Sequence, residues 1–282
     1  MQEIEIKHWH DFEAEIQNLT RQRERREAET GRRLNDPLFR GLGNSKWGPR
    51  TTLERSYPQD RSDETLSFLK YYRKVAAAKP AVETLTRKRW DEVPDFLHFK
   101  NLLRENENTL DQFLDEQPRI CEYLTYLRHH AFPSPLLDWT ASPYVAALFA
   151  LDIVAQGVEE VCVYAILQDA IRPRSSKQHL FIVGPYIKSH PRHYAQQSRY
   201  SICVATEGED YVFVPHEQAV SRALGPKGQA FKLRIRANAK ERLLALKHLD
   251  LMNINPFSVY GTEDSLIRTI ARRECLFQRW DL

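Results

Sequence analysis

Five segments rich in β-branched and aromatic residues constrain the fold of this chain most strongly, and all of them lie after residue 135. They are EVCVYAIL at 160–167, HLFIV at 179–183, RYSICVA at 199–205, DYVFV at 210–214 and QAFKLRIR at 229–236. Segments of this length and composition are typical of β-strands. Together they predict a mainly antiparallel sheet with helices packed on it, which is an α+β fold.

Helical patterns fill the stretch before these strands, from about residue 60 to 130. Ser62, with Asp63 and Glu64 next to it, is typical of an N-cap with acidic first-turn residues, and predicts a helix through Ala78. Two apolar stripes at helical spacing come next, one after Pro94 (Phe96, Phe99, Leu102 and Leu103) and one before the paired histidines (Ile120, Tyr123, Leu124 and Leu127). The sequence therefore predicts a helical block inserted into the sheet domain.

The two ends of the chain carry further elements. EIEIKH at 3–8 alternates like an edge strand, and Phe12, Ile16 and Leu19 begin an amphipathic helix. AKERLLALKHLD at 239–250 predicts a late helix, which Asn255-Pro256 separates from the C-terminal stretch. There is no internal repeat and no low-complexity linker, so we expect residues 1–282 to form one domain.

The composition gives no indication of a polyanion-binding, membrane-spanning or secreted protein. The 41 basic and 38 acidic residues leave a net charge of +3, which indicates no general affinity for polyanions. No stretch approaches the about 18 apolar residues of a membrane span, and the N-terminus does not resemble a signal peptide. The four cysteines (Cys121, Cys162, Cys203 and Cys275) lie far apart in apolar settings, which predicts buried reduced thiols and a cytoplasmic protein without a structural zinc.

The densest polar pattern lies between residues 127 and 150. Leu-Leu-Asp-Trp at 136–139 predicts a short strand, and Ser142-Pro143 predicts an N-cap with proline at the first helical position. The helix after this cap carries Ala146, Ala147 and Ala150, which allow close packing on a sheet. The free N–H groups at such a helix start are a standard place for a phosphate. Equally, Asp138 and Thr140 are explained by capping of the turn alone.

Three other segments place polar residues beside apolar ones. Arg40 stands between the apolar Phe39 and Gly41, at the predicted end of a short strand; Gln196 and Gln197 precede a strand; and Glu263 comes shortly after Gly261 at the entry to a helix. Each has a structural explanation when taken singly, since a strand-edge amide needs no ligand and a first-turn acid stabilises a helix by roughly 0.3–1 kcal/mol.

Taken in order, these segments resemble the motifs of the FRG domain family. The stretches are FRGLGNSKWGPRTTLER, RHHAFPSPLLDWTASPYVAALFA, RHYAQQSRYSI and YGTEDSL, and the resemblance runs over roughly residues 36 to 270. The family takes its name from the triplet that is here Phe39-Arg40-Gly41. This chain departs from the family pattern at Ser198, where a glycine often stands, and after Leu266, where the family often has a Phe-Pro-Asp-Leu-like run.

A more distant similarity implies a chemistry. Arg40, the Thr140/Ser142 pair and Glu263 are similar in order to the R-S-E pattern of ADP-ribosyltransferases, which implies an ADP-ribosyltransferase-like β core and NAD as substrate. By this resemblance Arg40 and Gly41 would hold the pyrophosphate, and Thr140 and Ser142 the nicotinamide ribose or amide. Glu263 would stabilise the oxocarbenium-like ribose. Asp138, Gln196 and Gln197 complete the expected NAD-binding set, and His129, His130, Arg268 and Arg272 the expected acceptor-binding set.

The leading hypothesis is thus a mono-ADP-ribosyltransferase that modifies a macromolecule, as a toxin or phage-defence effector, without a metal or a membrane partner. Basic residues near Glu263, and Trp90 beside Arg-Lys-Arg at 87–89, slightly favour a nucleic-acid acceptor, RNA in particular, over protein. A cognate antitoxin or inhibitor is a further expected partner.

Two alternatives stay open. One is a nucleic-acid hydrolase that uses His129, His130, Asp138 and Glu263, although the block at 127–150 lacks the ligand spacing of a metal site. The other is a non-catalytic RNA-binding module in which Arg40 and the C-terminal arginines contact phosphates.

Overall fold

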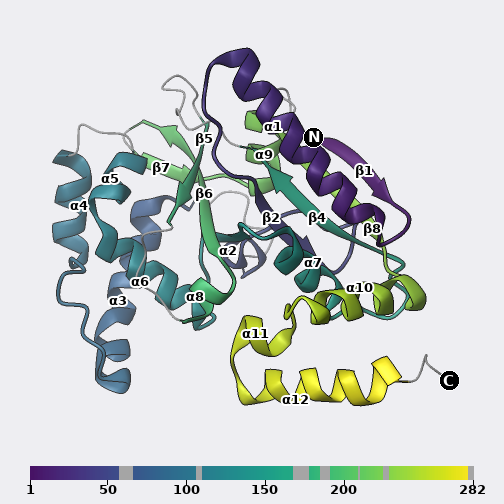
Figure 1. The fold of residues 1–282 in the computed structure, drawn as a ribbon. Helices are drawn as coiled ribbons and strands as arrows, with labels where there is room; N and C mark the ends of the chain where they lie inside the picture. The colour runs from purple at the N-terminus through teal and green to yellow at the C-terminus, as the bar shows by residue number, and fades with distance from the viewer. Residues whose placement is uncertain are drawn as a thin grey trace.

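The computed structural model describes residues 1–56, 66–105, 110–167, 178–184, 191–208, 210–224 and 229–278. Its strands form a single sheet in the order β1-β8-β4-β2-β3-β6-β5, with β7 paired to β6 (Figure 1). Their bounds are β1 Gln2–Ile6, β2 Leu38–Leu42, β3 Leu137–Thr140, β4 Glu160–Ile166, β5 Gln178–Val183, β6 Ser198–Glu207, β7 Asp210–Phe213 and β8 Ala230–Arg236.

The topology confirms the α+β prediction with a mostly antiparallel sheet. β1 and β8 pair in parallel at one edge, and the other described pairs are antiparallel. All five predicted strands after residue 159 are present within a few residues of their expected bounds, and β1 is the predicted edge strand.

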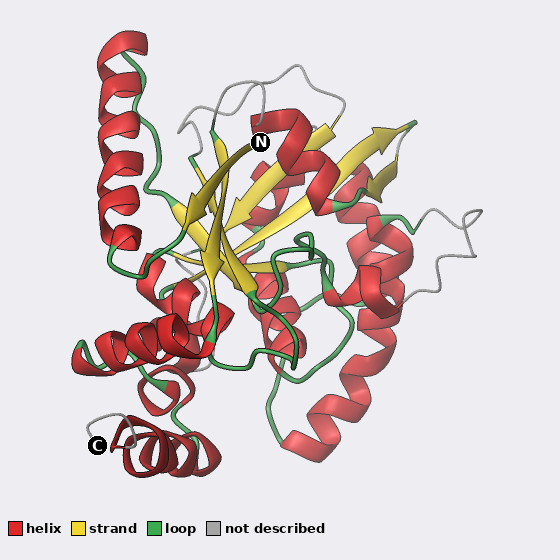
Figure 2. Cartoon of the chain, turned by 90° about the vertical axis from the view of Figure 1, so that its right-hand side faces the viewer, coloured by secondary structure: helices red, strands yellow, loops and turns green. Residues whose placement is uncertain are grey.

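Helices lie on both sides of this sheet (Figure 2). Their bounds are α1 Asp11–Thr30, α2 Thr52–Ser56, α3 Phe68–Thr86, α4 Phe96–Glu105, α5 Leu110–Glu116, α6 Pro118–His129, α7 Pro143–Leu151, α8 Pro191–Ala195, α9 His216–Leu224, α10 Ala239–Leu251, α11 Pro256–Tyr260 and α12 Glu263–Arg272, which a π-helical turn (Arg273–Phe277) continues. α3 to α6 form the predicted helical block beside β5, β6 and β7 (Figure 1).

The start of this block differs from its prediction. α3 begins at Phe68 and is capped by the side chain of Ser67, which accepts a hydrogen bond from the Lys70 N–H. It continues through Pro80 to Thr86, well past the predicted end at Ala78. The predicted cap at Ser62, Asp63 and Glu64 lies outside the described residues.

The sheet separates two apolar layers because strand side chains alternate between its faces. In β4, Val161, Val163 and Ala165 pack against α1, α7 and α10. The alternate residues, among them Cys162 and Tyr164, pack on the opposite face with Val220 of α9. β4 is therefore buried on both faces, which explains its continuous apolar sequence. A third cluster joins the helical block to β5 and β6.

The cysteine prediction was wrong for one residue. Cys121, Cys162 and Cys203 are buried, but Cys275 is exposed in the π-helical turn after α12. This turn contains no buried residue, so an apolar sequence context there does not lead to burial. None of the helices in the described part of the chain has the length and apolar character needed to cross a bilayer.

Candidate functional site

A pocket of 260 Å³ opens where β2 and β3 meet α7, α8 and α11. Its lining residues come from four separate stretches of sequence: Phe39, Arg40 and Gly41; Asp138, Trp139, Thr140 and Phe149; Gln196 and Ser198; and Tyr260. The pocket thus brings together most of the predicted NAD-binding residues.

Arg40 lies in the middle of β2 rather than at a strand end, which corrects the sequence interpretation. β2 pairs with β4 along its whole length, but with β3 at a single position, Phe39 with Thr140. Beyond that position the Arg40 guanidinium spans the two strands, because its Nη1 donates a hydrogen bond of 2.7 Å to the main-chain oxygen of Asp138. A long cationic side chain therefore occupies the place where the ladder between β2 and β3 stops.

The surroundings of Arg40 destabilise its charged guanidinium group. Its Nε is buried and has no hydrogen-bond partner among the described residues. Burial is the main cause that lowers the pKa of the guanidinium to about 10; Asp138 opposes this shift and Arg128 adds to it. Arg40 still carries its charge near neutral pH. Because a buried cation without full compensation is unfavourable, an anionic ligand at this pocket would stabilise it.

Asp138 is the acidic residue that lines the pocket, and it is already paired. Its carboxylate accepts a short hydrogen bond from Nη2 of Arg128, which α6 contributes. The side chain of Arg128 is mostly buried, and its Nε is a second buried nitrogen without a described partner. Asp138 consequently holds the two arginines beside the pocket, one through its carboxylate and one through its main chain.

Thr140 and Ser142 are engaged in the turn that starts α7. The Thr140 hydroxyl accepts a hydrogen bond from the Ser142 N–H at 3.0 Å, and the Ser142 hydroxyl accepts one from the Val145 N–H at 3.2 Å. The predicted N-cap and first-position Pro143 are confirmed. Thr140 lines the pocket although it is buried, whereas Ser142 does not line it.

Gly41 lines the pocket, and it is also the point where α7 crosses β2. A Cβ atom at Gly41 would lie 1.8 Å from the main-chain oxygen of Ala146 and 2.7 Å from the nitrogen of Ala150. The glycine is therefore required by the close approach of the helix, for which the small residues of α7 are the counterpart.

The paired glutamines point to different partners. Gln196 lines the pocket and is half-buried, with its Nε2 donating to the main-chain oxygen of Val259 in α11 at 3.3 Å. Gln197 has a positive φ of 48°, and its carbonyl accepts a hydrogen bond from the Ala141 N–H. Gln197 thus forms the turn between α8 and β6 and does not line the pocket.

Glu263 does not line the pocket either. It is exposed in the first turn of α12, directly after the N-cap residue Thr262. Tyr260, three residues earlier, does line the pocket, and its ring lies 5.9 Å from that of Phe149. Because consecutive Cα atoms are about 3.8 Å apart, the Cα atoms of Tyr260 and Glu263 are separated by at most about 11 Å.

The four predicted acceptor-binding residues do not line the pocket, and they contact other residues of the fold. His129 contacts the buried Tyr200 hydroxyl at 3.1 Å, and His193 contacts the same hydroxyl at 3.2 Å. His130 is exposed at the end of α6, with its ring against that of Tyr126.

Arg268 and Arg272 meet at one buried carboxylate. Arg272 Nη2 lies 2.5 Å from Asp152 at the end of α7, and Arg268 Nη1 lies 3.1 Å from it. The guanidinium of Arg268 also lies 5.4 Å from the centre of the Tyr260 ring, and that of Arg192 lies 6.0 Å from it. These arginines therefore attach α12 to α7 and position Tyr260 beside the pocket.

The family model of the FRG domain matches residues 35–157. This chain carries an FRG domain. The match includes the Phe39-Arg40-Gly41 triplet and the Leu-Leu-Asp-Trp-Thr stretch at 136–140, whereas the stretches at 192–202 and 260–266 lie outside it. Comparisons with curated proteins and with solved structures gave no match.

Some residues of this site were missed by sequence reasoning. Tyr260 and Phe149 form aromatic walls of the pocket, and Arg128 pairs with Asp138. Tyr260 and Arg128 each begin a stretch that resembles the FRG motifs, so the signal was present. A tyrosine or arginine at the edge of an apolar run is not, however, specific to a binding site.

Proposed function

We propose that this FRG-domain protein is an NAD-dependent mono-ADP-ribosyltransferase whose site is the pocket around Arg40. The main support for the proposal is that residues from all four motif-like stretches, between residues 39 and 260, line this one pocket. Residues with purely structural roles in separate motifs would not be expected to line one pocket that is open to solvent. Binding of a ligand explains that convergence.

The lining residues suit one end of NAD. Arg40 supplies a charged, planar donor for the pyrophosphate. Phe149 and Tyr260 offer aromatic surface to the nicotinamide ring, and the Gln196 amide offers polar atoms to its carboxamide. The volume of 260 Å³ is below the roughly 300–1,000 Å³ typical of sites that enclose a whole drug-sized ligand. We expect the nicotinamide ribose to occupy the pocket and the adenosine half to lie outside it.

The proposed reaction breaks the bond between the ribose C1 and the nicotinamide nitrogen, and the bonding electron pair leaves with nicotinamide. A nucleophile of the acceptor then bonds to C1 and loses its proton. A carboxylate near the ribose would stabilise the positive charge that develops before this bond forms. Asp138 already neutralises Arg128. We therefore assign that role to Glu263, which does not line the pocket but follows the lining residue Tyr260 by three positions.

The residues expected to favour a nucleic-acid acceptor have partners within the fold. Arg268 and Arg272 pair with Asp152, and Trp90 packs against Tyr123 and Tyr126, so these residues have structural explanations. Nucleic acid, RNA in particular, and protein are therefore tested side by side. A role as a toxin or phage-defence effector, with a cognate inhibitor, is proposed together with the activity.

The alternative of a metal-dependent nucleic-acid hydrolase gains no supporting observation. Within the described part of the chain, no three His, Cys, Asp or Glu side chains gather as metal ligands. The imidazole of His129 lies 3.1 Å from the Tyr200 hydroxyl, which gives this histidine a structural partner.

The experiment is incubation of the purified protein with NAD and total cellular RNA, DNA or protein, and then chromatography for nicotinamide and mass spectrometry for added ADP-ribose. The proposal predicts nicotinamide release that EDTA leaves unchanged, together with ADP-ribose on one acceptor class. Cleavage of nucleic acid that EDTA abolishes would support the hydrolase instead. Nucleic-acid binding without any consumption of NAD would support the non-catalytic module.

A further inference from the structure

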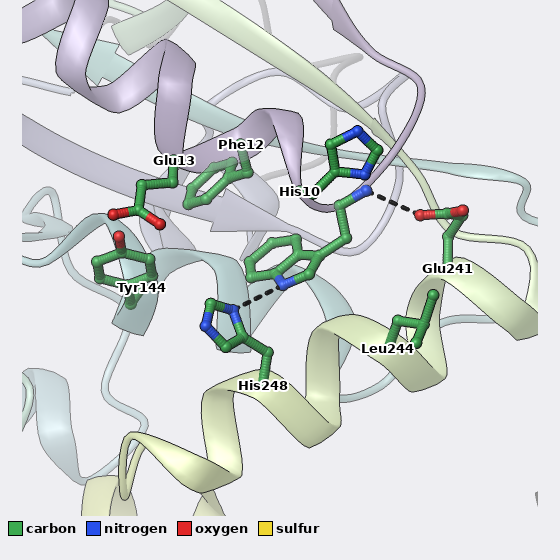
Figure 3. A pocket seen from close by; sticks show the side chains of 8 residues that line it. His10, Phe12, Glu13, Tyr144, Glu241, Leu244 and His248 are labelled. Atoms are coloured by element: carbon green, nitrogen blue, oxygen red, sulfur yellow. Dashed lines mark hydrogen bonds between the residues drawn. The ribbon is translucent and has the colours of Figure 1, made fainter.

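A second pocket, of 380 Å³, lies between α1, α7 and α10 and shares no lining residue with the site around Arg40 (Figure 3). It is lined by Trp9, His10, Phe12, Glu13, Tyr144, Glu241, Leu244 and His248. None of these residues has a part in the proposed transferase reaction. The second pocket is therefore a site distinct from that of the proposed reaction.

Aromatic rings form the inner wall of this pocket. The Trp9 ring stacks on that of Phe12 at 4.9 Å, and Tyr144 meets Phe12 edge to face at 6.0 Å. Trp9 and Phe12 are buried and belong to the core that joins α1 to α7 and α10, so the wall is rigid. The faces of such rings carry the negative part of the aromatic quadrupole, which attracts cations.

Two carboxylates flank this wall from opposite sides. Glu13 lies beside Tyr144, and Glu241 lies beside Leu244 on the other side, with Phe12 and His248 between them (Figure 3). The carboxylate of Glu241 is fixed, because it accepts a hydrogen bond of 2.8 Å from the Trp9 N–H. That bond lowers the pKa of Glu241, so the group is ionised near neutral pH. Glu13 is exposed and forms no ion pair with a described residue.

Of the three histidines near the pocket, only His8 contacts one of these two carboxylates, and it does not line the pocket. The indole Nε1 of Trp9 can only donate a hydrogen bond, and it lies 3.0 Å from His248 Nδ1. His248 therefore accepts at Nδ1 and carries its proton on Nε2, which makes the ring neutral. His10 lies 3.1 Å from the carboxylate of Asp11, and His8 lies 3.4 Å from that of Glu241. No lysine or arginine lines the pocket.

From this combination we infer that the pocket binds an organic cation, an alkylammonium or alkylguanidinium group whose carbon chain packs on Trp9 and Tyr144 between the two carboxylates. The ligand is either a small free amine or the side chain of a lysine or arginine in a polypeptide. An anion would be repelled by both carboxylates, and a neutral apolar ligand would desolvate them without compensation. A cation gains from the carboxylates and from the aromatic wall together.

The test is an NMR titration of protein labelled with ¹⁵N-tryptophan, because the Trp9 indole N–H reports on the pocket itself. Its signal is assigned by loss in a Trp9→Phe variant. The probes are butylammonium and butylguanidinium, with butanol as the neutral control and butyrate as the anionic control. We expect both cations to shift the Trp9 signal saturably at millimolar concentrations, as suits ligands of this size, and both controls to leave it in place.

A charge variant makes the test specific. Glu13→Gln should weaken butylammonium binding about three- to fivefold, the upper part of the effect expected for an exposed ion pair. Glu24→Gln, which removes an exposed acid of α1 outside the pocket, should not change it. Blocked lysine and arginine amides then separate the two sources: binding as strong as that of butylammonium indicates a polypeptide side chain, and much weaker binding indicates a free amine.

Three results would overturn the inference. They are no Trp9 shift with either cation at about 50 mM, equal shifts with butanol or butyrate, and equal affinities of the wild-type and Glu13→Gln proteins.

Discussion

Replacement of Gly41 by alanine should separate α7 from the sheet, because the added methyl group would meet the helix backbone rather than a side chain. The new Cβ would lie 1.8 Å from the Ala146 oxygen, whereas real Cβ contacts essentially never fall below 3.0 Å. The strand and the helix must therefore move apart locally by at least about 1.2 Å. No rotamer change relieves the clash, since both the strand and the helix present main-chain atoms.

The cost depends on the packing around this contact. α7 lies in the main core with Val163 and Ala165 of β4, so a displacement loosens contacts beyond Gly41 itself. Overpacking costs typically about 1–3 kcal/mol, and a backbone clash belongs at or above the upper end. With about 2 °C per kcal/mol for a chain of this size, we expect Gly41→Ala to lower the melting temperature by about 6 °C or more.

The assay is thermal unfolding monitored by circular dichroism, with Gly48→Ala as the matched control. A Cβ at Gly48 would also overlap a neighbour, at 2.2 Å, but that neighbour is the carboxylate of Glu217 at the end of a flexible side chain. Rotation of Glu217 should limit the loss to about 1 kcal/mol or less. Equal melting temperatures for the two variants would refute the reasoning that the helix backbone, and not crowding in general, requires glycine at position 41.

Three further outcomes are expected. Glu263→Gln should reduce nicotinamide release about 100-fold, on the order of 2.7–4 kcal/mol in the barrier, and lower the melting temperature by about 2 °C or less. Asp264→Asn in the same helical turn should lower the melting temperature equally little and leave turnover unchanged. Near wild-type turnover of folded Glu263→Gln protein would remove Glu263 from the site. Arg272→Met should cost about 3 kcal/mol in urea unfolding, because it removes a partner of the buried Asp152 carboxylate. Adding Asp152→Asn should restore part of that loss, and no recovery would argue against the pair. A chromogenic disulfide reagent should modify Cys275 in the native protein and the buried thiols only after unfolding, so rapid native modification of all four thiols would contradict the fold.

The features that sequence predicted well are those fixed by near neighbours in the chain. The start of α7 is an example, since the Ser142 cap and Pro143 act within one helical turn. The strands after residue 159 are another, because their β-branched and aromatic composition matches burial on the faces of a sheet. Arg40, Thr140, Gln196 and Glu263 were expected to line one cleft, as polar residues at the ends of apolar strands. The first three line the pocket, but Glu263 does not.

The features that sequence missed depend on partners distant in the chain. Arg40 was expected at a strand end, but the position of β2 between β3 and β4 cannot be read from a five-residue segment. Arg272 was expected to contact an acceptor, yet its partner is Asp152, 120 residues away. A sequence pattern does not distinguish an arginine that binds a ligand from one that binds a buried carboxylate, because both need the same guanidinium.

The central claim is that Arg40 and its neighbours bind NAD, and calorimetric titration of NAD into wild-type and Arg40→Lys protein tests it most directly. A lysine keeps the charge but cannot span from β2 to Asp138 and also offer the guanidinium fork to a pyrophosphate. We predict saturable NAD binding by the wild type and at least about tenfold weaker binding by Arg40→Lys protein that melts normally. The absence of NAD binding by the wild type, or equal affinity in the two folded proteins, would contradict the account.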